Sequence, residues 1–199
     1  MPHITTSALL ASPRSYLLDS ATRYGLISRT LHWLTAAIVL LQFSVVLAWR
    51  GYGETSFTLT LSNIGPHGSL GVLLLLITLL RAGWAFLNRQ QRPSPAAGLR
   101  GALAHTVHLT FYALLIALPT LAILRQYGRG GALDVYGLPL FNAAEREIPW
   151  MINIANLVHS PLAWLLLALG IGHVAMALMH HFGFKDKMLS RMAEPINRY

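Results

Sequence analysis

The stretch HSPLAWLLLALGIGHVAMALMHHF, residues 159–182, decides the fold of this chain. It contains no Asp, Glu, Lys or Arg, and as an α-helix rising about 1.5 Å per residue it is long enough to cross a bilayer. It also carries His159 and His173, fourteen positions apart. At about 100° per residue both rings leave nearly the same face of the helix, about 21 Å apart along its axis. That separation suits two cofactors, one near each membrane surface.

The rest of the chain is similarly apolar. Its 199 residues are 54% hydrophobic and 11% charged, whereas ordinary soluble domains have about 25% charged residues. Four segments without a charged residue can each span a hydrocarbon core of about 30 Å: 31–49, 64–80, 101–124 and 152–182. The sequence therefore predicts an all-α, integral membrane four-helix bundle over residues 28–195. Residues 1–27 are predicted to form an N-terminal extension, and residues 196–199 a C-terminal tail.

The net charge of +8 is unevenly distributed across these segments. The side with both termini and residues 81–100 holds eleven Lys and Arg residues against three Asp and Glu residues, and the other side holds four against four. By the positive-inside rule, both termini are expected in the cytoplasm. The basic charge thus indicates membrane topology, and nucleic acid is not expected as a partner.

The chain has no cysteine, which excludes thiolate metal sites, iron–sulfur clusters and haem attached through a Cys-x-x-Cys-His motif. Histidine remains as the strong ligand. His67 and His159 both begin their spans from the outer side, so they can meet there. His32 begins its span from the inner side and can meet His173. Two rings at each depth suit the axial positions of haem b, so two haems stacked across the membrane are expected. Zinc would need three or four converging ligands.

The inner pairing leaves alternatives open. His173 lies about 13 Å from the inner end of its span, whereas His32 lies about 5 Å past Arg29. One of three other histidines near the inner surface could instead pair with His32: His105, His108 or His180.

Arg81 lies near the inner end of the second span, where an intramembrane charge is costly. It either extends toward the headgroups or pairs with a buried anion such as a haem propionate.

Over residues 27–195 the chain resembles the bacterial cytochrome b561 family, particularly its small four-helix members that oxidise superoxide. The matching positions are Leu31, His32, Trp33, His67, Leu103, Ala104, His105, His108, Leu109, Tyr112, Tyr127, Arg129, Gly130, His159, Leu162, Ala163, His173, His180, His181, Lys185, Asp186, Leu189, Arg191 and Met192. The resemblance implies a multi-pass protein of the bacterial inner membrane. It further implies that electrons pass from superoxide at the periplasmic face through two haems to ubiquinone, and that four histidines ligate these haems: His32, His67, His159 and His173.

The resemblance also suggests roles for other residues. Arg129 matches an arginine of the family's outer loop, and Arg125 lies one turn away; both are candidates for steering superoxide, or else ordinary interfacial anchors. Four histidines near the inner face are candidates for binding quinone or relaying protons, or for binding propionates or headgroups: His105, His108, His180 and His181. Pro161 follows His159 by two residues and could alter the direction of its ring.

Two rival functions remain. The chain could be an electron-relay subunit that docks a redox partner, such as a dehydrogenase or hydrogenase, without a substrate of its own. Alternatively, the histidines could line the path of a metal transporter, which would bind no haem. The short outer loops and the lack of a large docking domain favour a self-sufficient oxidoreductase.

Overall fold

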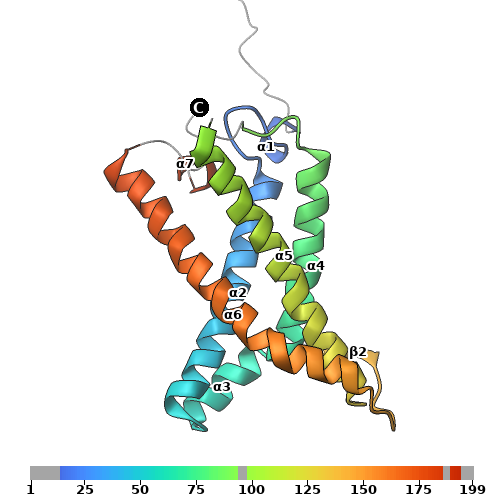
Figure 1. Cartoon of the computed structure of the whole chain (residues 1–199). Coiled ribbons are helices and arrows are strands. Elements are labelled where there is room, and N and C mark those ends of the chain that lie inside the picture. The colour runs from blue at the N-terminus through green and yellow to red at the C-terminus, as the bar shows by residue number, and fades with distance from the viewer. Residues whose placement is uncertain (1–13, 94–97, 186–188, 194–199) are drawn as a thin grey trace, which may run out of the picture.

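The computed structural model describes residues 14–93, 98–185 and 189–193 (Figure 1). Residues 1–13 of the predicted N-terminal extension and residues 196–199, the predicted tail, lie outside this part of the chain. The described residues are mostly helical, with one small antiparallel hairpin.

Four helices are long and apolar enough to cross a membrane, which confirms the prediction of a helical membrane protein. They are α2 (Leu26–Tyr52), α4 (His67–Leu87), α5 (Gly98–Gly128) and α6 (Pro149–Leu178), the last of which continues as a π-helical turn, η1 (Met179–Gly183). Pro149 lies in the first turn of α6, where backbone N–H groups have no partner within the helix, so the N–H that proline lacks is not needed. Gly53 ends α2 with a φ of 64°, a conformation that glycine adopts without strain.

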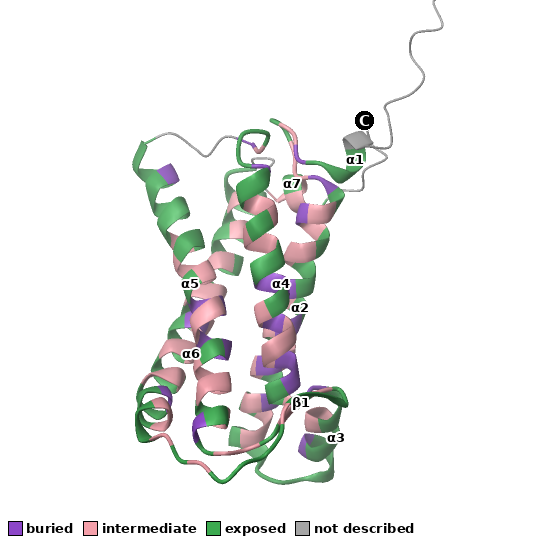
Figure 2. Cartoon of the chain, turned by 90° about the vertical axis from the view of Figure 1, so that its right-hand side faces the viewer, coloured by how far each residue is buried: buried purple, intermediate pink, exposed green. Residues whose placement is uncertain are grey.

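The helices pack in chain order, α2 against α4, α4 against α5, and α5 against α6. Figure 2 shows α2 and α4 on one side of the bundle and α5 and α6 on the other. Aliphatic side chains from all four helices form the buried core: Ile38, Leu70, Leu74, Ile77, Leu114, Leu115, Leu118 and Leu166. Only Leu166 comes from α6, and 6% of the most apolar part of α6 is buried, against 22% in the other three spans. α6 is therefore the least enclosed helix.

A short helix, α3 (Ser56–Ile64), occupies the segment between the first two spans, which the sequence analysis did not predict. The Thr55 hydroxyl accepts a hydrogen bond from the Thr58 N–H, and the Thr58 hydroxyl accepts one from the Thr55 N–H. This reciprocal capping starts a helix, but the pattern here has Thr in place of the usual Glu or Gln.

The hairpin lies beside the start of α4. Strands β1 (Leu133–Val135) and β2 (Leu138–Phe141) are joined by Tyr136 and Gly137, both at positive φ, as a tight two-residue hairpin turn requires. The Ser69 hydroxyl of α4 donates to the Asp134 carbonyl at 3.0 Å. The outer segment 126–150, expected to form short irregular pieces, therefore folds over the end of α4 that holds His67.

A buried carboxylate organises the opposite end of the bundle, near α1 (Arg14–Leu17). The Asp19 side chain has no solvent exposure and accepts hydrogen bonds from the Gly25 N–H, the Ser28 hydroxyl and Arg92 Nε, each at 2.8 Å. Trp84 Nε1 of α4 donates to the same Ser28 hydroxyl at 3.1 Å. Asp19 thus links the segment before α2 to α4 and to the α4–α5 connection.

The other terminal segment lies at this end as well. In α7 (Ser190–Ala193), the Met192 carbonyl accepts hydrogen bonds from Arg29 Nε at 2.9 Å and Trp33 Nε1 at 3.1 Å. Both donors belong to the first turns of α2. The segments near the two termini are therefore held at the same end of the bundle (Figure 1).

We predict that Asp19→Ala lowers the free energy of unfolding by about 2 kcal/mol, because it leaves three donors without their shared acceptor. Thermal unfolding of the purified protein in detergent measures this loss. Asp134→Ala is the matched control, since that carboxylate accepts only from the Gly137 N–H in an exposed turn. Equal melting temperatures for the two variants would contradict the role given to Asp19.

Candidate functional site

Two histidine rings from different helices lie close together at the end of the bundle where α4 begins, the end expected to face outward and called the outer end below. His67 is the first residue of α4, after Pro66, and His159 lies in α6. Their ring centroids are 6.3 Å apart and the ring planes are inclined by 72°. The structure thus brings together the two residues that the depth argument paired at the outer side.

A second pair lies toward the other end. The rings of His32 in α2 and His173 in α6 have centroids 6.4 Å apart, with planes inclined by 64°. His108 of α5 is also close, 5.8 Å from the His173 ring, and Phe111 packs on the same ring at 5.5 Å. The inner site therefore holds the expected pair together with a third imidazole, one of the alternatives that the sequence left open.

The spacing within both pairs fits a metal held between two imidazoles. A transition metal lies about 2 Å from a ligating imidazole nitrogen, which places the centroids of two rings on opposite sides of it roughly 6 Å apart. In the part of the chain that the structure describes, no group of three or more His, Cys, Asp or Glu side chains could hold a metal ion by itself. The donor set suits a group that brings its own equatorial ligands, as haem does, better than it suits zinc.

His159 also has a partner that can fix its orientation. Its ring lies near the backbone carbonyl of Leu118 in α5. Metal-ligating histidines commonly donate their second N–H to such an acceptor. α6 continues as a helix through Pro161, and the Leu118 carbonyl lies on the neighbouring helix. A hydrogen bond to that carbonyl would fix the ring direction of His159 from α5.

Arg81 lies between the inner pair and α5. Its Nη2 is 3.0 Å from Nδ1 of His32, and its guanidinium lies over the Tyr112 ring, 5.5 Å from the centroid. Arginine has only donors, so Nδ1 must be the acceptor in this contact. An iron bound at Nε2 would leave the proton on Nδ1, and Arg81 would then need another acceptor. Haem carries carboxylates that can fill this role.

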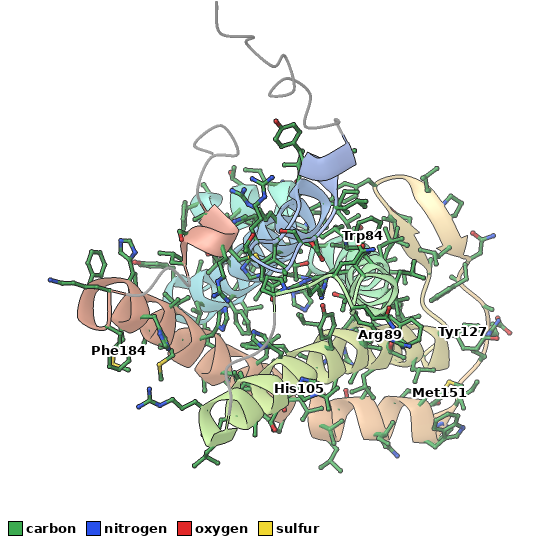
Figure 3. All side chains as sticks on the ribbon, turned by 90° about the horizontal axis from the view of Figure 1, so that it is seen from above. Trp84, Arg89, His105, Tyr127, Met151 and Phe184 are labelled. Atoms are coloured by element: carbon green, nitrogen blue, oxygen red, sulfur yellow. The ribbon has the colours of Figure 1, made fainter. Side chains whose placement is uncertain are left out.

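The remaining predicted residues lie around these pairs. His105 is exposed on α5, one turn from His108 (Figure 3). His180 and His181 lie in η1, against the rings of Phe184 and Phe182, respectively.

The two outer arginines are placed differently. Arg125, near the end of α5, is close enough to interact electrostatically with the His159 ring. Arg129 lies one turn further, and its backbone N–H donates to the Arg125 carbonyl. Both side chains belong to exposed residues. Of the two, the structure connects Arg125 to the outer ring pair.

The sequence argument overlooked Gln42. It is buried in α2, and its Nε2 donates to the His67 backbone carbonyl at 3.1 Å. The sequence did contain a signal for Gln42: a carboxamide within an otherwise apolar span is costly and tends to have a specific role. Its partner could not be predicted, since 25 residues separate Gln42 from His67.

Sequence comparison agrees with this arrangement. A model of the prokaryotic cytochrome b561 family matches residues 23–195, which include all four paired histidines. The chain belongs to the prokaryotic cytochrome b561 family. "Cytochrome b561 homolog 2" of Escherichia coli is 31% identical over 183 residues, covering 87% of this chain and 93% of that protein. "Probable superoxide oxidase CybB" of Yersinia pestis is 27% identical over 172 residues, covering 85% and 95%. "Cytochrome b561 homolog 1" of Escherichia coli is 24% identical over 169 residues, covering 81% and 92%.

This cytochrome b561 protein is accordingly a multi-pass protein of the bacterial inner membrane, in a family of haem-binding oxidoreductases that transfer electrons. Haem b is the typical cofactor of the family, and the two ring pairs fit it by their spacing. The family assignment confirms the resemblance inferred from the histidine pattern.

We predict that His67→Ala reduces haem per chain by about half, because it removes one axial ligand and leaves the inner pair intact. The pyridine haemochrome assay on purified protein measures the ratio. His105→Ala serves as the control, since His105 is exposed and lies outside both pairs. A His67→Ala protein with the full complement of haem would contradict the outer pairing.

Proposed function

We propose that this protein oxidises superoxide at the periplasmic face of the inner membrane and reduces ubiquinone near the cytoplasmic face. Two superoxide anions each lose one electron and leave as O₂. One ubiquinone takes up these two electrons and two protons from the cytoplasm to become ubiquinol. In this proposal two haems b lie in the electron path, one held by His67 and His159 and the other by His32 and His173.

The proposal rests on the two pairs of histidine rings, one toward each end of the bundle. α6 contributes one histidine to each pair. Haem supplies reversible one-electron transfer, which connects a one-electron donor to a two-electron acceptor. The similarity to a relative named as a probable superoxide oxidase supports superoxide as the donor. The distribution of basic residues supports placing both termini in the cytoplasm, so that the outer pair faces the periplasm.

In this proposal the outer end attracts the anionic donor. His67 and His159 would together hold the outer haem, and superoxide would then give up its electron without binding the iron. Arg125, which interacts with His159, gives the approach a positive charge, and Arg129 adds a second one turn away. Positive charge at the mouth of such a site raises the association rate of an anion.

The inner end has to bind quinone and supply protons. His108 is the strongest candidate because its ring centroid lies 5.8 Å from that of His173. His105 on the same helix, and His180 and His181 in η1, are the candidates that could extend a proton path toward the cytoplasm. In this proposal Arg81, whose Nη2 lies 3.0 Å from Nδ1 of His32, would pair with a propionate of the inner haem.

Anaerobic stopped-flow absorbance of the purified protein tests the function. We expect superoxide to reduce the haem bands rapidly and ubiquinone to reoxidise them, with no partner protein present. If the bands stay oxidised with superoxide but are reduced by a weak chemical donor, superoxide is not the substrate and the relay-subunit function is favoured. Protein supplied with haem that shows no haem bands would overturn the proposal as a whole.

We predict that Arg125→Gln slows haem reduction by superoxide about three- to tenfold at low ionic strength, because it removes positive charge beside the outer pair. Raising the salt concentration should reduce this difference, since it screens exposed charges. Arg89→Gln makes the same charge change beyond the far end of α4 and should leave the rate unchanged. Equal rates for Arg125→Gln and Arg89→Gln would show that Arg125 is only an interfacial anchor.

A further inference from the structure

Gln42 has a buried oxygen without a hydrogen-bond partner. Gln42 is only 9% exposed, and its Oε1 is the one buried side-chain N or O atom, among the residues that the structure describes, that makes no hydrogen bond. The orientation of the amide is not arbitrary: the His67 carbonyl can only accept, so Nε2 must face it and Oε1 must point elsewhere. Oε1 is therefore an acceptor in need of a donor.

Several hydroxyl side chains in the spans bond within their own helix. The hydroxyls of Thr35, Ser44 and Thr78 each donate to the carbonyl four residues earlier in their own helix. A carboxamide oxygen cannot do this because it has no proton, and the backbone N–H groups within a helix are already used. A buried acceptor left in this state is destabilising, which is why most such atoms in proteins have a partner.

His67 is the neighbour that will require an acceptor. If its Nε2 binds iron, its Nδ1 carries a proton that must be donated. The ring of His108 lies near the carbonyl of Ala104, four residues back in α5, and that of His159 lies near the carbonyl of Leu118. His67 is the first residue of α4, so the residue four positions back, Asn63, belongs to α3 and not to the same helix. Its own helix therefore offers no equivalent carbonyl.

We propose that Gln42 is the positioning residue of the outer haem site: its Nε2 holds the His67 backbone, and its Oε1 accepts the Nδ1 proton of His67, directly or through one water. This inference rests on the proposed function, in which His67 ligates a haem. Gly71, one turn into α4, leaves room for the amide: a Cβ at that position would lie 3.8 Å from Gln42 Nε2.

The consequence is electronic as well as structural. An acceptor on Nδ1 makes the imidazole a more basic ligand, which favours ferric iron and lowers the reduction potential of that haem. Gln42 should therefore lower the potential of the outer haem and leave the inner haem unaffected. A side chain that only fills space would not change one potential selectively.

Spectroelectrochemical titration of the purified holoprotein tests this inference in Gln42→Leu, which keeps the approximate volume and removes both polar atoms. Removing such an outer hydrogen-bond partner typically changes metal binding at least tenfold. We expect the equilibrium constant for reducing the outer haem to rise about tenfold, an upward shift of about 59 mV for a one-electron couple. The inner haem should keep its potential, and His67→Ala, which lacks the outer haem, identifies which transition is which.

Two further variants complete the test. Gln42→Glu, in its neutral form, keeps one donor and one acceptor and should restore the wild-type potential. Thr78→Val removes an equally buried polar atom that bonds only within its own helix, and should change neither potential. Loss of the outer haem in Gln42→Leu with retention in Gln42→Glu would also support the inference.

Unchanged potentials in Gln42→Leu, or the same shift in Gln42→Glu, would overturn the role of Gln42. Neither result would affect the proposed function. The proposed function fails separately, if the wild-type protein carries no outer haem or its haems are not reduced by superoxide.

Discussion

The rest of this structure depends on one constraint: histidine rings of α6 lie beside histidine rings of α2 and α4. α6 packs against α5 and contributes one residue, Leu166, to the main buried cluster. Its relation to α2 and α4 is marked by His173 beside His32 and by His159 beside His67. In lipid, apolar helices gain little by leaving the hydrocarbon for one another, and polar or closely packed contacts decide their association. A cofactor bound between each pair would therefore serve as part of the helix packing as well as the electron path.

The parts of the chain outside the spans hold the ends of this arrangement. At one end, the hairpin carrying Asp134 bonds to Ser69 and stabilises the first turn of α4, two residues from His67. At the other end, Asp19 links the start of α2 to α4 through Ser28, and Met192 binds the same region of α2 that carries His32. Each end thus fixes the backbone of a histidine-bearing helix close to the ring.

The charged and polar groups within or beside the spans are few, and each has a specific contact. Arg81 contacts His32, Arg125 interacts with His159, and Gln42 holds His67. Such groups are expensive in a membrane unless they are paired, and these three lie beside the ring pairs that the proposed function uses. In the proposed function, the same contacts would set the orientation of the rings and the electrostatics around the two haems.

The sequence by itself determined the membrane class, the four spans, the family and the pairing of histidines by depth, because apolar length and the fourteen-residue interval within α6 are local properties of a helix. The hairpin and α3 were missed, since their turn and capping signals are weak in isolation. Only the tertiary structure decided that His108 lies beside the inner pair, that Arg81 contacts His32, and that Gln42 reaches His67. These contacts join residues on different helices, and their existence depends on how the helices are rotated and spaced, which no periodicity within one segment specifies.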